Sequence, residues 1–178
     1  NGAHYLDITG EIEVLERIYA SNDRAAKTKT VAIPGVGFDI IPGDCMAKQL
    51  HTLLPDADSF EVAFHGSSRL SPGTLKTMVE NLHKGGKVRR DGKIIDVPFG
   101  YQLKEVSFTD GKYWVGAIPW GDVASTYFST RIPNITVYGP FSKTMVPLAR
   151  MLGAFSDVLK NRMLHNFLKQ TVDSFVKG

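Results

Sequence analysis

The chain has 178 residues, 43% of them hydrophobic and 22% charged, a balance that favours a folded globular protein over a disordered one. Its net charge of +3 reflects 21 basic and 18 acidic residues, an excess too small to indicate nucleic-acid binding. The single cysteine, Cys45, excludes an intrachain disulfide and fits a reducing, cytoplasmic compartment.

The start of the chain has the composition of a strand. It begins at Asn1 without an initiator methionine, and the apolar-rich residues 3–8 follow at once. A natural protein rarely opens on a strand without a leader, so we expect this sequence to be part of something longer. We find no signal peptide, and no apolar run reaches the roughly 18 residues that a membrane-spanning helix needs.

The next elements alternate between strand and helix. Residues 5–8 form a short strand that stops at Gly10, and Glu11 and Glu13 suit the first turn of a helix, where the helix dipole favours carboxylates. Residues 30–33 form a second strand, closed by the glycine-rich segment 34–37. This order of strand, helix and strand predicts a parallel pair.

A third helix is expected between two prolines. Pro42 suits its first position, and Pro55 ends it. The spacing of Met46, Leu50 and Leu53 predicts that they form its buried face. Cys45 lies on the same apolar stretch, so we expect it to pack in the core rather than act as a nucleophile. A further helix is expected from Ser71-Pro72 to the glycines at 85 and 86.

The middle of the chain is predicted to be β-structure. Asp91-Gly92 and Asp110-Gly111 have the composition of two-residue hairpin turns of type I′. Candidate strands are residues 60–64, 94–97, 103–108, 113–118 and 135–138. From Met145 the pattern returns to helix, and residues 162–176 are amphipathic. The fold class is therefore predicted to be α+β.

Two groups of residues are candidates for binding sites. The five histidines are scattered without HExxH or paired CxxC spacing, so we expect no metal site. A basic cluster surrounds the first predicted hairpin and most simply forms its solvated rim, with phosphate binding as the alternative. The members of this cluster are Lys84, Lys87, Arg89, Arg90 and Lys93.

The segment Pro34-Gly35-Val36-Gly37-Phe38-Asp39 is similar to a dinucleotide-binding fingerprint but lacks its third glycine, whose place is taken by Ile40. It is therefore not a pyrophosphate loop. It is either a tight structural turn or a second ligand-binding loop at the carboxyl edge of the sheet.

Residues 119–127 place an indole, a carboxylate, hydroxyls and a phenol close together after a strand. One interpretation is a buried Trp120 with Asp122 capping a short helix. The other is a substrate wall, where polar groups converge beside an aromatic face.

Three stretches together resemble one family. They are His4-Tyr5-Leu6-Asp7-Ile8-Thr9-Gly10-Glu11, then Gly37-Phe38-Asp39-Ile40-Ile41-Pro42-Gly43-Asp44, and then Pro119-Trp120-Gly121-Asp122 with Ser129-Thr130-Arg131-Ile132-Pro133-Asn134-Ile135-Thr136-Val137-Tyr138. In order and spacing they resemble the saccharopine dehydrogenase-like oxidoreductases, which include trans-acting enoyl reductases. Ile40 and Gly43 depart from the family pattern, because many relatives have serine at both places.

The resemblance implies the domain organisation. Residues 1–57 would be the C-terminal part of a Rossmann-like NAD(P)-binding domain whose first βαβ unit is absent. Residues 58–178 would be an α+β substrate and dimerisation domain with a mixed or antiparallel sheet and helices on one face. NADP or NAD would serve the full-length protein, acting on a small-molecule or acyl substrate. This chain alone is expected to bind no dinucleotide and to be inactive.

Site residues follow from the resemblance together with the sheet-edge rule for ligand binding. Gly35, Gly37, Phe38 and Asp39 are predicted to line the nicotinamide end of the cleft. Trp120 and Ser125 are predicted to contact substrate, and Asp122 or Tyr127 to donate the proton or orient its donor. The alternative function is a non-catalytic interaction module that self-associates or binds lipid. The amphipathic residues 162–176 favour this alternative. We expect a homodimer, no nucleic-acid partner and little membrane contact.

Overall fold

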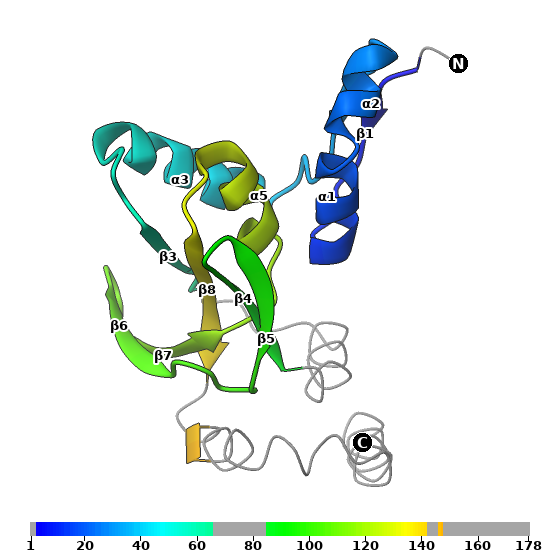
Figure 1. The fold of residues 1–178 in the computed structure, drawn as a ribbon. Helices are drawn as coiled ribbons and strands as arrows, with labels where there is room; N and C mark the ends of the chain where they lie inside the picture. The colour runs from blue at the N-terminus through cyan, green and yellow to red at the C-terminus, as the bar shows by residue number, and fades with distance from the viewer. Residues whose placement is uncertain (1–2, 66–84, 142–145, 148–178) are drawn as a thin grey trace, which may run out of the picture. The chain divides into compact units, whose positions relative to one another are not determined.

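The computed structural model describes residues 3–65, 85–141 and 146–147 (Figure 1). The helices predicted across residues 71–84 and 148–178 lie outside the described residues. The chain divides into two compact units. The first combines Asn1–Val62, Lys87–Ile95 and Pro119–Val137, and the second combines Ala63–Gly86, Asp96–Ile118 and Tyr138–Gly178. The domain boundary expected near residue 57 stays a prediction.

The first unit opens with a parallel strand pair. Strands β1 (Tyr5–Leu6) and β2 (Ala32–Ile33) pair parallel, and helices α1 (Ile12–Tyr19) and α2 (Asn22–Lys27) connect them (Figure 1). The predicted order of strand, helix and parallel strand is therefore confirmed. Its assignment to a Rossmann domain stays a prediction, because two strands do not define one.

Helix α3 (Ile41–Leu53) begins with Pro42 in its first turn, as predicted. The predicted buried face is wrong: Met46, Leu50 and Leu53 are 56%, 41% and 68% exposed. The buried residues are Gly43 and Ala47, which lie one turn apart on the side that packs against helix α5 (Asp122–Thr130). Small side chains allow the two helix backbones to come close. The buried face of α3 is therefore the face whose backbone can approach α5, not the face with the largest apolar side chains.

Cys45 is also exposed, which corrects its predicted core position. Its place on α3 lies outside the narrow face formed by the small residues. A helix that packs through glycine and alanine buries few of its neighbouring side chains, so the thiol remains accessible to solvent.

A six-stranded sheet supplies the β-structure (Figure 1). Its strands are β3 (Ser59–Ala63), β4 (Gly86–Arg90), β5 (Lys93–Val97), β6 (Lys104–Phe108), β7 (Gly111–Ala117) and β8 (Asn134–Phe141). The order is β5-β4-β8-β7-β6, and β3 also pairs with β8. The pairs β4–β8, β6–β7 and β7–β8 are antiparallel, so the predicted mixed α+β class is confirmed.

The two predicted turns have different outcomes. Asp91 and Gly92 both have positive φ, 49° and 75°, as a type I′ turn requires. The second hairpin exists, but Phe108 pairs with Gly111, so the two turn residues are Thr109 and Asp110. Gly111 is therefore the first residue of β7, and the predicted turn is displaced by one residue.

A small apolar cluster in the first unit supports α3 and α5. Ala47, Phe60, Ile132 and Ile135 form its buried centre, and the half-buried ring of Tyr127 packs against it. Helix α5 ends where Arg131 adopts a left-handed backbone conformation with φ of 66°. Across the described residues, no helix is long and apolar enough to cross a membrane.

Candidate functional site

The loop after β2 and the segment before α5 lie in contact within the first unit. The indole Nε1 of Trp120 donates a hydrogen bond of 2.7 Å to the backbone oxygen of Asp39. A Cβ added at Gly121 would lie 2.3 Å from Cδ1 of Ile40 and 2.9 Å from the backbone oxygen of Gly10. Two stretches identified in the sequence, 81 residues apart, are therefore in contact. Whether either binds a ligand stays a prediction.

The two loop glycines have different structural requirements. Gly35 has φ of +71°, and its amide donates to Oδ1 of Asp7 at 2.8 Å, so the turn itself needs glycine there. A Cβ at Gly37 would make only an ordinary contact of 3.4 Å with Ile8. Phe38 is 79% exposed and offers an open aromatic face beside them. Gly35 thus fits the structural-turn interpretation, while Gly37 and Phe38 leave the ligand-binding one open.

Asp122 is the most unusual side chain of the site. It is fully buried, and neither carboxyl oxygen has a hydrogen-bond partner. It does not cap α5, because Gly121 holds the N-cap position, so the capping interpretation is wrong. Burial, opposed by its own backbone amide and assisted by the nearby carboxylates of Asp44 and Asp39, raises the pKa of Asp122 from 3.8 to about 7. Near neutral pH this carboxyl therefore holds its proton about half the time.

Two hydroxyls share the side of α5 that carries Asp122. Ser125 and Thr126 follow it by three and four residues, the spacing at which side chains lie on one helix face. Both are buried, and neither hydroxyl oxygen has a hydrogen-bond partner. The first turns of α5 thus hold a stripe of unsatisfied polar atoms, which is rare in a folded protein and needs an explanation.

Tyr127 does not join this stripe. It follows Asp122 by five residues, which places it about 140° further round the helix. Its ring packs against the apolar cluster and lies under the Arg89 guanidinium, 4.1 Å from the guanidinium carbon to the ring centroid. A Cβ at Gly92 would lie 3.2 Å from the Tyr127 hydroxyl. The two residues predicted to share proton transfer therefore face different neighbours.

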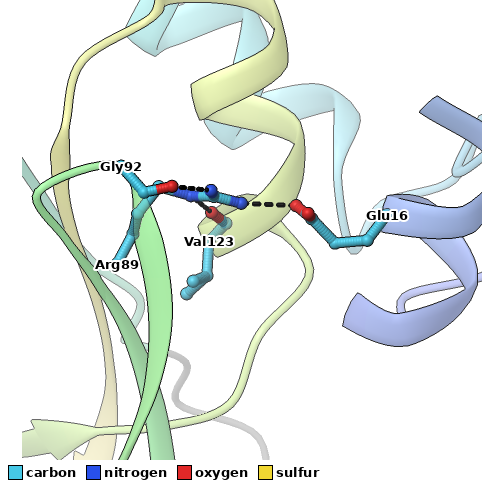
Figure 2. Close-up of polar contacts among 4 residues, drawn as sticks. All are labelled: Glu16, Arg89, Gly92 and Val123. Carbon is cyan, nitrogen blue, oxygen red and sulfur yellow. Dashed lines mark hydrogen bonds and ion pairs between the residues drawn. The ribbon is translucent and has the colours of Figure 1, made fainter. Parts of the chain in front are cut away.

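Arg89 is buried, which corrects the predicted solvated rim. Its side chain is 3% exposed and reaches three acceptors, as Figure 2 shows. Nε donates to the backbone oxygen of Val123 at 2.9 Å, Nη1 donates to that of Gly92 at 2.6 Å, and Nη2 pairs with the Glu16 carboxylate. The guanidinium thus ties the β4–β5 turn and α1 to the first turn of α5.

Of the other members of the basic cluster, Lys93 is exposed on β5, as a solvated rim requires, whereas Lys87 and Arg90 are engaged. Lys87 pairs with Glu13 at 3.5 Å, and Arg90 donates to Oγ1 of Thr136 at 2.8 Å. Lys84 lies outside the described residues. These partners could not be predicted from the sequence, because a run of basic residues has the same pattern whether its side chains face water or carbonyl oxygens.

Several residues of this region were missed from the sequence. Ser129 donates to Oδ1 of Asp44 at 2.9 Å, and the Lys48 ammonium donates to the backbone oxygen of Ser129 at 3.1 Å. Tyr19 stacks on Phe128 with centroids 4.2 Å apart, and burial raises its pKa above the usual value, with Asp44 and Glu16 adding to the effect. The four-residue spacing of Asp44 and Lys48 places them on one face of α3 but carries no signal of these partners.

The described residues include no candidate metal centre. Nowhere in the ranges that the structure covers do three His, Cys, Asp or Glu side chains gather to hold a metal ion. An open groove of about 610 Å³ runs along α1, α2, β1 and β2, where Arg17 and Arg24 join apolar side chains. It contains none of the predicted site residues, so this groove and the predicted site do not coincide.

The fold and the site define a mixed α+β protein with a buried, proton-holding carboxyl beside a glycine-containing loop. Comparison with known proteins adds no family to that description: no family model matches the sequence, and no curated protein matches it.

Proposed function

We propose that this chain is part of an NAD(P)-dependent oxidoreductase similar to the saccharopine dehydrogenase-like enzymes. The observation that carries the proposal is Asp122, a buried carboxyl that retains a proton near neutral pH. Reduction by hydride needs a proton delivered close by, and a donor works best when its pKa lies near the working pH. Trp120 connects the segment of this donor to the loop after β2.

The chain's own residues fit one end of a nicotinamide cofactor. Phe38 presents an exposed ring, and Gly37 leaves space beside it. The bound cofactor would supply the hydride. The chain has no three-glycine phosphate loop at residues 35–40, so tight dinucleotide binding would need residues beyond this sequence. NADP or NAD and a small-molecule or acyl substrate belong to this proposal, as does a cytoplasmic homodimer.

Two measurements test it. Titration of this chain with NADPH and NADH, followed by fluorescence, should give no binding at micromolar concentration. Micromolar affinity would contradict the expectation that this chain lacks the phosphate-binding site. The second measurement uses the protein encoded by the complete reading frame, with NADPH oxidation followed by absorbance across thioester-linked enoyl and imine substrates. Turnover on any of them supports the proposal, and absence of turnover on all of them contradicts it.

Variants then assign the proton donor. Asp122→Asn keeps the size of the side chain but cannot donate the same proton, so turnover should fall by about 10² or more. Tyr127→Phe should have a smaller effect, because the hydroxyl lies towards the β4–β5 turn. Asp56→Asn, on an exposed residue, is the control. An active Asp122→Asn enzyme with an inactive Tyr127→Phe enzyme would reverse the assignment.

A second candidate function is self-association without chemistry, and exposed apolar side chains favour it. Leu6, Ile8, Val31 and Ile33 around the parallel pair are between 46% and 76% exposed. Parallel sheets are normally covered on both faces, so such exposure is typical of an interaction surface. Sedimentation of the wild type and of Leu6→Lys/Ile33→Lys tests this. A wild type that remains monomeric at high concentration counts against self-association.

A further inference from the structure

The closest approach between α3 and α5 occurs where Gly43 meets Asp122. A Cβ added at Gly43 would lie 1.8 Å from Oδ1 of Asp122 and 2.8 Å from its Cγ, so no side chain fits between them. The carboxyl is thus covered by the backbone of the first turn of α3. Because both oxygens are buried without a partner, the contact holds a neutral carboxyl far better than a charged one.

The surroundings of Asp122 offer no counter-charge. Among the described residues, the titratable or charged side chains that interact with Asp122 or with its helix are Asp39 before α3, Asp44 and Lys48 on α3, Glu16 and Tyr19 on α1, and Arg89 on β4. The two cations of this set are already engaged, since Lys48 bonds the Ser129 carbonyl and Arg89 pairs with Glu16. The nearest carboxylates, Asp39 and Asp44, repel a second negative charge.

We propose that Asp122 and Gly43 form a proton-operated latch: while Asp122 is neutral, the first turn of α3 stays closed against α5, and ionisation of Asp122 releases that turn. The inference does not depend on the oxidoreductase proposal, in which Asp122 would reach a substrate only while this turn is open. Ionised oxygens need water, and water reaches them only if the backbone at Gly43 withdraws.

The loop after β2 moves with the latch. The amides of Ile40 and Ile41 both donate to the Gly37 carbonyl, at 3.2 and 3.0 Å, so the loop and the first turn of α3 form one continuous structure. When the turn opens, the loop is still held by the bond from Trp120 to Asp39 and by the amides of Gly35 and Val36, which donate to Asp7. The latch therefore couples the protonation state of a buried acid to the accessibility of residues 37–44.

Its direction with pH follows from the raised pKa. Burial, followed by repulsion from Asp44 and Asp39, raises the pKa of Asp122 from 3.8 to about 7. A group whose folded pKa lies above its unfolded one favours the closed form fully below the unfolded pKa, and this contribution is lost as the pH rises through the folded pKa. The closed latch is therefore favoured most in acid, and this preference is lost progressively between about pH 4 and pH 7.

Amide hydrogen exchange tests the latch on the chain as it stands. Protection factors are measured for the amides of residues 40, 41 and 43–46 at about pH 5.5 and about pH 8.5, after correction for intrinsic exchange rates. The wild type should lose protection there by about tenfold or more at the higher pH. Asp122→Asn, which cannot ionise, should keep its protection at both, and Asp56→Asn, on an exposed residue, should behave like the wild type. Equal wild-type protection at both pH values would overturn the proposal, as would an equal loss in Asp122→Asn.

A second variant keeps the test decisive if Asp122→Asn does not fold. Alanine is a better helix former than glycine, and the φ of Gly43 is not in the left-handed region, so Gly43→Ala is harmful only through the contact with Asp122. It should hold the turn open at both pH values. Gly43→Ala/Asp122→Ala removes the clash and should close the turn again without pH dependence. Wild-type protection in Gly43→Ala at acid pH would refute the latch.

Discussion

Arg89 and Glu16 form an ion pair although 73 residues separate them in the sequence. The guanidinium is 3% exposed, whereas the Glu16 side chain is 44% exposed, so the pair lies at the edge of the unit with its cation inward (Figure 2). The same guanidinium donates to the Val123 carbonyl on the first turn of α5. Arg89 therefore connects three elements that are far apart in sequence.

We predict that Arg89→Ala lowers the free energy of unfolding by about 3 kcal/mol, because carbonyls of Val123 and Gly92 lose their donor and the Tyr127 ring loses its cation. Glu16→Gln should cost about 1 kcal/mol or less, since this partly exposed side chain can be hydrated. Urea unfolding of both variants measures the difference. Lys93→Ala, on an exposed residue of β5, is the control, and equal losses for all three would contradict the buried role of Arg89.

The pH dependence of stability should change with Asp122. Its pKa is raised to about 7, so ionisation destabilises the fold progressively as the pH rises from about 4 to 7. Asp122→Asn removes this cost, and at about pH 8 it should be more stable than the wild type by up to about 4 kcal/mol. At about pH 4 the two proteins should differ little. Urea unfolding at both pH values decides, and a difference that does not grow with pH would rule out a raised pKa.

The orientation of α3 predicts an asymmetry between its two faces. Leu50→Gln and Leu53→Gln lie on its exposed stripe and should change stability by no more than about 0.5 kcal/mol. Ala47→Leu adds volume to the apolar cluster beside α5 and should cost about 1–3 kcal/mol. Thermal unfolding of the three variants measures both effects. Large losses of stability in the leucine variants would show instead that the face predicted from the apolar spacing is the buried one.

The bond from Trp120 to Asp39 should order the loop after β2. Trp120→Phe keeps an aromatic ring but removes the Nε1 donor, so stability should fall by about 1 kcal/mol. Exchange protection of amides 40 and 41, which donate to Gly37, should fall with it. Hydrogen exchange followed by NMR measures this, with Phe38→Leu, an exposed ring of the same loop, as the control. Unchanged protection in Trp120→Phe would show that the indole only covers the loop.

Local chemistry predicted the elements whose geometry depends on neighbours in sequence. Apolar runs and a glycine break predicted the strand–helix–strand unit of β1, α1 and β2. Pro42 predicted the start of α3, and Asp91-Gly92 predicted the turn between β4 and β5. The candidate site was predicted in part: the sequence indicated both the loop after β2 and the start of α5, but not the contact between them.

Tertiary packing decided the rest. Apolar spacing predicted Met46, Leu50 and Leu53 as the buried face of α3, but Gly43 and Ala47 let α5 approach more closely. Nothing local marked Arg89 as buried, since its acceptors on α1, the β4–β5 turn and α5 converge only in the fold. Asp122 likewise resembles any acidic residue in the first turn of a helix. Its pKa is raised because the backbone at Gly43, contributed by a helix almost 80 residues away, excludes water from its carboxyl, and because that helix and the loop before it bring Asp44 and Asp39 close.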